Sequence, residues 1–166
     1  MFSKDEYVVY ATNGVCLIED IAPMRNSEDD RLYYILRPVS NGASVLYVPM
    51  DNSVLCEKMR YVFDETGLQN ILDEVKSQSL EWVDDRKNRM NLFRQILHGG
   101  SLKELILLAD CIYKRREYLE KAGKRLSDAD DNVFRSAIRI VNDEFSWSLG
   151  IPKTSVNGYI MNYMLS

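Results

Sequence analysis

Few residues of this 166-residue chain have the type and spacing to do chemistry. The single histidine, His98, stands directly before Gly99-Gly100, where a histidine usually caps the end of a helix rather than acting as a base. No nucleophile elbow accompanies it, and neither the P-loop pattern nor GxGxxG occurs. Asp128, Asp130 and Asp131 lack the glycine and distal glutamate of an EF-hand loop, and acids in the first turn of a helix are favoured by its dipole. The sequence therefore predicts no enzyme, no metal site, no cofactor and no small-molecule substrate.

The cysteines and the hydropathy pattern bear on the compartment. Cys16, Cys56 and Cys111 are odd in number, far apart and outside any metal-ligand spacing, so we expect reduced core thiols. No apolar run reaches the roughly 18 residues needed to span a bilayer. The N-terminal segment MFSKDEYVVY has no basic region followed by an apolar core, as a signal peptide would. These features predict a cytoplasmic protein with no membrane partner.

Charge is distributed unevenly along the chain. The net charge is −4, which by itself argues against a general nucleic-acid binder. Residues 1–80 carry 7 basic and 13 acidic side chains, whereas residues 81–166 carry 14 basic and 12 acidic ones. This asymmetry predicts two parts with different partners.

The N-terminal part has the pattern of short strands. Asn13-Gly14 and Asn41-Gly42 fit tight turns, and Pro49 ends the last run because it cannot donate to a sheet ladder. Strands this short and numerous favour a small barrel of the Tudor or SH3 type over an open flat sheet. The runs rich in β-branched and aromatic residues are Tyr7–Tyr10, Val15–Ile18, Leu32–Leu36 and Val45–Val48.

From about residue 66 the apolar spacing becomes helical. The overall prediction is an α+β protein, with a barrel over residues 1–55 and an all-α domain over residues 56–166; the composition allows a boundary anywhere near residues 51–64. Gly99-Gly100 predicts a left-handed helix end, and Ser101 with Glu104 predicts a capping box. The predicted helices cover residues 67–76, 82–98, 101–123, 127–150 and 152 onwards.

Two groups of residues have the character of binding sites. Trp82 is predicted at the start of a helix that also carries Arg86, Lys87 and Arg89, and an aromatic beside several cations can insert at a DNA step while the cations neutralise phosphates. The alternative is a core tryptophan beside a solvated charged face. The second group is a cluster that could equally be a solvated helix end; it consists of Lys114, Arg115, Arg116, Lys121, Lys124 and Arg125.

The order of these segments resembles the CarD/CdnL/TRCF family. The carrying motifs are the four strand runs above, the Ile-Leu-His-Gly-Gly-Ser segment after Trp82, the Gly-Lys-Arg-Leu-Ser segment at 123–127 and the Asp-Glu-Phe at 143–145. The helical half selects the CarD branch, because the transcription–repair coupling factors share only the barrel. Relatives often have a basic residue at the position of Tyr47, so we expect an aromatic contact to replace an ionic one here.

The resemblance implies a bacterial transcription regulator. It would bind the RNA polymerase β subunit at the β1 lobe, also called the protrusion, and stabilise the open complex by contacting promoter DNA at the upstream edge of the bubble. The alternative is a polymerase-bound protein–protein adaptor that never touches DNA. The implied polymerase contacts are Arg25, Arg37 and Tyr47, and the implied DNA contacts are Trp82, Arg86, Lys87, Arg89, Lys124 and Arg125.

Overall fold

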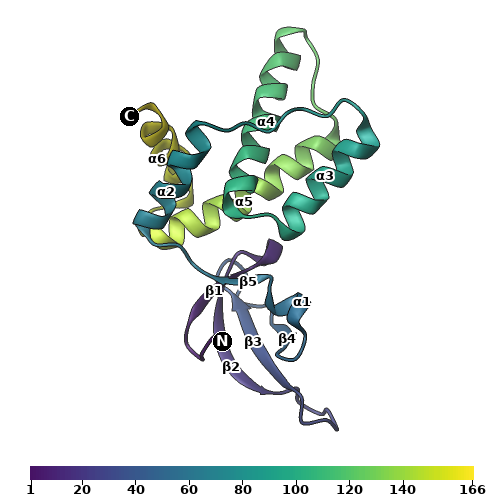
Figure 1. The fold of residues 1–166 in the computed structure, drawn as a ribbon, viewed down its shortest axis with the longest axis vertical. Helices are drawn as coiled ribbons and strands as arrows, with labels where there is room; N and C mark the ends of the chain where they lie inside the picture. The colour runs from purple at the N-terminus through teal and green to yellow at the C-terminus, as the bar shows by residue number, and fades with distance from the viewer. The chain divides into compact units, whose positions relative to one another are not determined.

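A computed structural model describes residues 1–166 and divides them into two compact units, Met1–Val62 and Phe63–Ser166 (Figure 1). The boundary predicted at residue 55 lies earlier than the one in the structure. Residues 59–61 form a strand that pairs with the first strand of the chain, so they belong to the N-terminal unit.

The N-terminal unit is built on a five-stranded antiparallel sheet with the order β4-β3-β2-β1-β5. The four predicted strands are confirmed, and β5 and the short helix α1 were missed because neither has a repeating apolar pattern long enough to identify. The elements are β1 (Tyr7–Tyr10), a 3₁₀ turn η1 (Ala11–Asn13), β2 (Val15–Pro23), β3 (Leu32–Pro38), β4 (Leu46–Pro49), α1 (Ser53–Cys56) and β5 (Met59–Tyr61).

The sheet is open, so the prediction of a closed barrel was wrong. Edge strands β4 and β5 have only four and three residues, and each pairs with a single neighbour. Helix α1 lies between them in the chain, and Leu55 and Cys56 pack on the core of the sheet. The apolar side chains of this helical turn therefore cover part of the core, although β4 and β5 do not pair to close the sheet. The buried core comprises Val8, Cys16, Ile18, Tyr34, Leu36, Val48 and Met59.

The C-terminal unit is entirely helical, and all five predicted helices are confirmed. Side-chain caps explain where they begin: Asp64, Asp85, Ser101 and Ser127 each accept a hydrogen bond from a backbone amide of the first turn. Helices α4 and α5 pack together, and α2 and α6 lie side by side (Figure 1). None of the helices combines the length and apolarity of a membrane-spanning segment. The helices are α2 (Glu65–Lys76), α3 (Arg86–Gly99), α4 (Leu102–Lys121), α5 (Asp128–Leu149) and α6 (Lys153–Leu165).

Helix α3 begins later than the sequence predicts. The Asp85 side chain accepts a hydrogen bond from the Asn88 amide at 2.9 Å, which makes Asp85 the N-cap. Trp82 therefore lies in the segment that precedes the helix rather than in its first turn. Because Trp82 is outside the helix, its ring can pack back against a side chain of α3.

Gly100 ends α3 for a different reason from the predicted left-handed turn. Its φ of −75° and ψ of 155° are extended values that any residue can adopt. A Cβ at this position would lie 2.5 Å from the carbonyl oxygen of Ile96, whereas a Cβ at Gly99 would meet nothing within 4 Å. The requirement for glycine is therefore a close approach of the backbone to itself.

Gly100→Ala should lower the free energy of unfolding of the helical unit by about 1–3 kcal/mol, because the backbone must shift to admit the methyl group. Gly99→Ala is the matched control, and it should be neutral or stabilising by up to about 1 kcal/mol, since alanine favours helix. Urea unfolding followed by circular dichroism measures both. Equal stabilities for the two variants would show that the contact with Ile96 is not limiting.

Candidate functional site

Trp82 is half-buried against α3. It is therefore neither a fully exposed aromatic nor a fully buried core tryptophan, the two alternatives that the sequence left open. Its ring meets that of Phe93 edge-on, with the centroids 6.0 Å apart and the planes at 68°. Phe93 is fully buried in the core of the helical unit. Trp82 is therefore anchored on one side by the core while part of its surface remains accessible.

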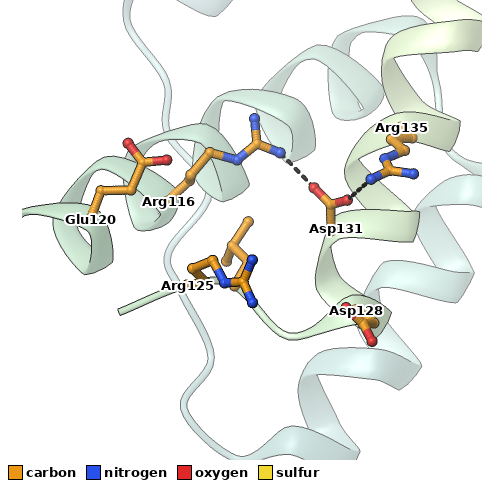
Figure 2. A pocket seen from close by; sticks show the side chains of 7 residues that line it. Arg116, Glu120, Arg125, Asp128, Asp131 and Arg135 are labelled. Carbon is orange, nitrogen blue, oxygen red and sulfur yellow. Dashed lines mark hydrogen bonds and ion pairs between the residues drawn. The ribbon is translucent and has the colours of Figure 1, made fainter. Parts of the chain in front are cut away.

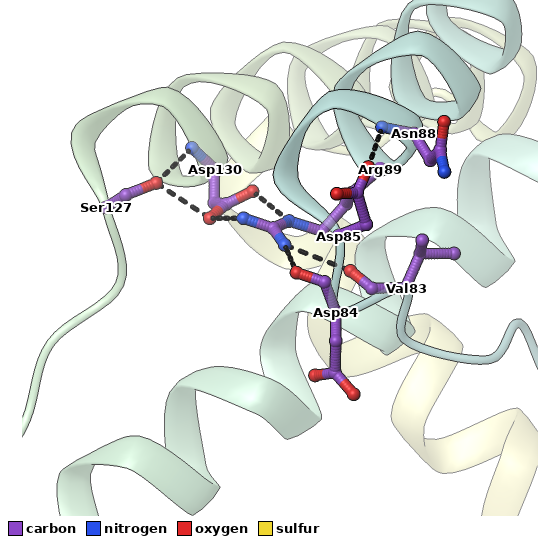
Figure 3. A network of polar contacts seen from close by, with 7 residues as sticks. All are labelled: Val83, Asp84, Asp85, Asn88, Arg89, Ser127 and Asp130. Carbon is purple, nitrogen blue, oxygen red and sulfur yellow. Dashed lines mark hydrogen bonds and ion pairs between the residues drawn. The ribbon is translucent and has the colours of Figure 1, made fainter.

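Arg89 lies next to Trp82 and is itself buried, with 8% of its surface exposed. Its Nε and one terminal nitrogen donate to the two carboxylate oxygens of Asp130 at 3.0 and 3.2 Å. The other terminal nitrogen donates to the carbonyl oxygens of Val83 and Asp84, each at 3.0 Å (Figure 3). Arg89 was predicted to contact DNA, but the structure places it inside the unit with all three guanidinium nitrogens hydrogen-bonded. A planar guanidinium suits this arrangement, because it can donate to a carboxylate and to two carbonyls at once.

The Arg89 network fixes the segment that carries Trp82. Ser127 adds a hydrogen bond from its hydroxyl to Asp130 at 2.7 Å (Figure 3). Asp130 belongs to α5 and lies 41 residues from Arg89 in the sequence. The carbonyls bound by Arg89 follow Trp82 directly, so the pair ties the tryptophan segment to the starts of both α3 and α5. Sequence reasoning missed Asp130 because its spacing gave only a helix-start signal.

Two guanidinium groups lie over the Trp82 ring. The Arg89 carbon Cζ is 4.6 Å from the ring centroid, and that of Arg115, from α4, is 5.2 Å away. Arg115 also lies 4.9 Å from the ring centroid of Tyr118, an exposed residue of the same helix. Such distances are in the range of cation–π attraction. The structure thus brings Arg115, a member of the second predicted basic group, to the tryptophan, with Tyr118 on the same guanidinium. Tyr118 was not among the predicted site residues.

The remaining predicted DNA contacts are exposed. Arg86 and Lys87 occupy the first turn of α3, close in sequence to Trp82, and Lys124 and Arg125 lie in the connection from α4 to α5. The ion pair between Arg89 and Asp130 joins the start of α3 to the start of α5. Both groups of cations therefore lie near these two joined helix starts.

A pocket of about 290 Å³ lies between the end of α4 and the start of α5. Asp131 accepts ion pairs from Arg116 at 2.7 Å and from Arg135 at 2.6 Å (Figure 2). The pocket is lined by three arginines and three acids, so it has no excess charge with which to attract an anion. The lining residues are Arg116, Glu120, Arg125, Leu126, Asp128, Asp131 and Arg135.

The cysteines are free thiols in both units. Cys16 and Cys111 are buried, and Cys56 is half-buried. Burial, together with the nearby Asp110 and Glu81, raises the pKa of Cys111 to about 11, so the thiolate form is suppressed at neutral pH. No group of three histidine, cysteine, aspartate or glutamate side chains is gathered as metal ligands.

The outer face of the sheet presents an aromatic surface at the β4 edge. Tyr47 is 42% exposed and lies opposite Ile35 in the β3–β4 register. Its ring meets that of Tyr33 edge-on, with the centroids 6.4 Å apart. Since β4 pairs only with β3, the backbone along its other side has no strand partner in the sheet.

Arg37 shares this face with Ile35, because alternate residues of a strand point to the same side. Its guanidinium forms a two-point pair with Glu19, at 3.1 and 2.9 Å, and donates to the Gly42 carbonyl. The charge of Arg37 is thus matched within the free protein. Arg25, the third predicted polymerase contact, is exposed in the connection between β2 and β3.

Comparison with known proteins identifies the N-terminal unit. No curated protein matches the chain. Residues 2–62 match the family model described as the CarD-like/TRCF RID domain. The N-terminal unit is a CarD-like/TRCF RID domain.

The RID domain is a protein-interaction domain of transcription-associated proteins that engage RNA polymerase, and the match covers residues 2–62 of the 166-residue chain. The match ends at the boundary found in the structure, after Val62. It covers the sheet with Tyr47 and Arg37 and does not extend to Trp82. The surface at the β4 edge is therefore supported by both the family match and the geometry, whereas the surface around Trp82 is supported by the geometry alone.

Proposed function

We propose that the RID domain binds the β subunit of RNA polymerase at its β1 lobe, or protrusion, and that the helical unit contacts promoter DNA at the upstream edge of the bubble and stabilises the open complex. The observation that carries the proposal is the unpaired β4 edge with Tyr47 and Tyr33 on a RID domain.

The polymerase contact follows from the chemistry of this edge. An exposed strand edge can add a strand from a partner, so that backbone hydrogen bonds supply affinity and side chains supply specificity. Tyrosine provides a large contact area and a polar group at low entropic cost, and it is enriched at interaction hot spots. Arg37 is already neutralised by Glu19, so the contact should depend on Tyr47 more than on charge.

The DNA contact must be weak without a tether. Residues 63–166 contain 15 basic and 16 acidic side chains, which gives this unit a net charge of −1. Few phosphates can then be neutralised, and affinity for free duplex at physiological salt should be low. Binding to polymerase would raise the effective concentration of the helical unit at the promoter, so that Trp82 and the exposed Arg86 and Lys87 act locally.

Tyr47→Glu should weaken binding of the full chain to the isolated β subunit by at least tenfold, because a carboxylate without a partner is costly to bury in an interface. Isothermal titration calorimetry measures the dissociation constant. Tyr113→Glu is the control, since it makes the same substitution at an exposed tyrosine of the helical unit and should leave the constant unchanged. An unchanged affinity of Tyr47→Glu would place the polymerase contact elsewhere on the RID domain.

The adaptor function without DNA contact is favoured by one observation: the acids at the start of α5 neutralise the arginines beside them. Binding to forked promoter DNA in the presence of polymerase separates the two candidates. A DNA-contacting protein should increase the retention of forked DNA by polymerase, and salt should diminish this increase. An adaptor should have no effect on DNA retention at any salt concentration.

A further inference from the structure

Arg115 differs from its neighbours in having no anionic partner. Within the run of residues 114–116, Lys114 pairs with Asp110 at 2.6 Å and Arg116 pairs with Asp131 at 2.7 Å. Arg115 forms no ion pair, and its Nε is buried without a hydrogen-bond partner. Its guanidinium instead lies over two aromatic rings.

The two rings determine where the Arg115 guanidinium lies. Its Cζ is 5.2 Å from the ring centroid of Trp82 and 4.9 Å from that of Tyr118. A guanidinium has five N–H donors in a fixed plane, and a buried donor without an acceptor costs free energy. Cation–π contacts hold the group in place but accept none of its N–H bonds in the way an oxygen does. The side chain is therefore held in position by the two rings, while none of its N–H groups donates to another residue of the protein.

We propose that Arg115 binds a backbone phosphate of DNA beside Trp82. The inference rests on the proposed DNA contact and extends it by assigning a phosphate ligand to Arg115. A guanidinium can hold two phosphate oxygens at once, which fixes the orientation as well as the distance of the strand. A phosphate bound here would place the adjoining nucleotides next to the accessible part of the Trp82 ring, and the exposed ring of Tyr118, 63% accessible, would support the other side of the guanidinium.

The test measures how salt affects binding of a fluorescent forked promoter duplex to polymerase saturated with the full chain, relative to polymerase alone, by anisotropy from 20 to 200 mM salt. Each phosphate contact contributes about 0.7–0.9 to the slope of log affinity against log salt. Arg115→Gln should lower the slope by about this amount, so that the affinity lost between 50 and 200 mM salt becomes smaller by about threefold. Arg116→Gln removes the same charge from the adjacent position but leaves Trp82 untouched, and its slope should stay close to that of the wild type.

Arg115→Lys provides a second variant that keeps the charge. It should retain the slope yet bind several-fold more weakly, because a lysine ammonium cannot form a two-point contact with phosphate or stack as a plane. A lower melting temperature of Arg115→Gln with an unchanged slope would overturn the proposal and leave Arg115 as a cover for Trp82. If Arg115→Gln does not fold, an affinity of Arg115→Lys equal to that of the wild type would overturn it.

Failure of the proposed function gives a different result. If the wild-type chain shows no salt-dependent binding to forked DNA even at 20 mM salt, with or without polymerase, the DNA contact itself is wrong and the assignment of Arg115 falls with it. If the wild type binds and Trp82→Ala weakens binding while Arg115→Gln and Arg115→Lys do not, only the assignment of Arg115 is wrong.

Discussion

Asp130→Asn is expected to lower the free energy of unfolding of the helical unit by about 3–5 kcal/mol. Asp130 is 3% exposed, and its carboxylate is the only acid paired with the buried Arg89. The substitution leaves a buried positive charge without its counterion, and it turns an amide N–H₂ toward a group that can only donate. Chemical unfolding followed by circular dichroism at pH 7 measures the loss.

Asp131→Asn is the control for Asp130→Asn because it stands next in the sequence and also pairs with arginines. Its side chain is 24% exposed, and Arg135, one of its partners, is 74% exposed. Solvent screens pairs of this kind, so the expected loss is about 1 kcal/mol or less. Similar losses for the two variants would mean that the Arg89–Asp130 pair does not hold the starts of α3 and α5 together.

Trp82→Ala is expected to shorten the lifetime of the open promoter complex by roughly 5- to 150-fold while polymerase binding stays intact, since one stacking contact is worth about 1–3 kcal/mol. The variant also loses the edge-on contact with Phe93 and the cation–π contacts of Arg89 and Arg115. Because the tryptophan is only half-buried, Trp82→Ala should lower the free energy of unfolding by less than the roughly 3–5 kcal/mol lost on truncating a fully buried aromatic. Competitor-challenge kinetics measure the lifetime, and thermal melting measures the stability.

Gly100→Ala serves as the control for Trp82→Ala because it destabilises the same unit without removing the ring. It should leave the lifetime of the open complex unchanged at temperatures well below its melting point. A stable Trp82→Ala variant with a wild-type lifetime would exclude the tryptophan from the mechanism and favour the adaptor function. A loss as large as that of a fully buried aromatic would instead mark Trp82 as a core residue.

The sequence by itself determined the elements whose causes are local. Ser101 and Glu104 form the predicted capping box, and Ser127 caps α5, because these hydrogen bonds join residues three positions apart. Gly150 adopts the left-handed conformation that ends α5. Turn residues and β-branched runs likewise located four of the five strands, and the motif order was enough to identify the family of the N-terminal unit.

Only the tertiary structure decided what depends on distant partners. The sequence cannot distinguish Arg89 from Arg86, since both follow Trp82 in one basic run, yet the fold buries the first against Asp130 and leaves the second in solvent. Closure of the sheet was also undecidable, because it depends on whether two short edge strands meet. The position of Arg115 beside Trp82 follows from the packing of α4 against the segment before α3, and no spacing within the chain predicts a contact between side chains more than thirty residues apart.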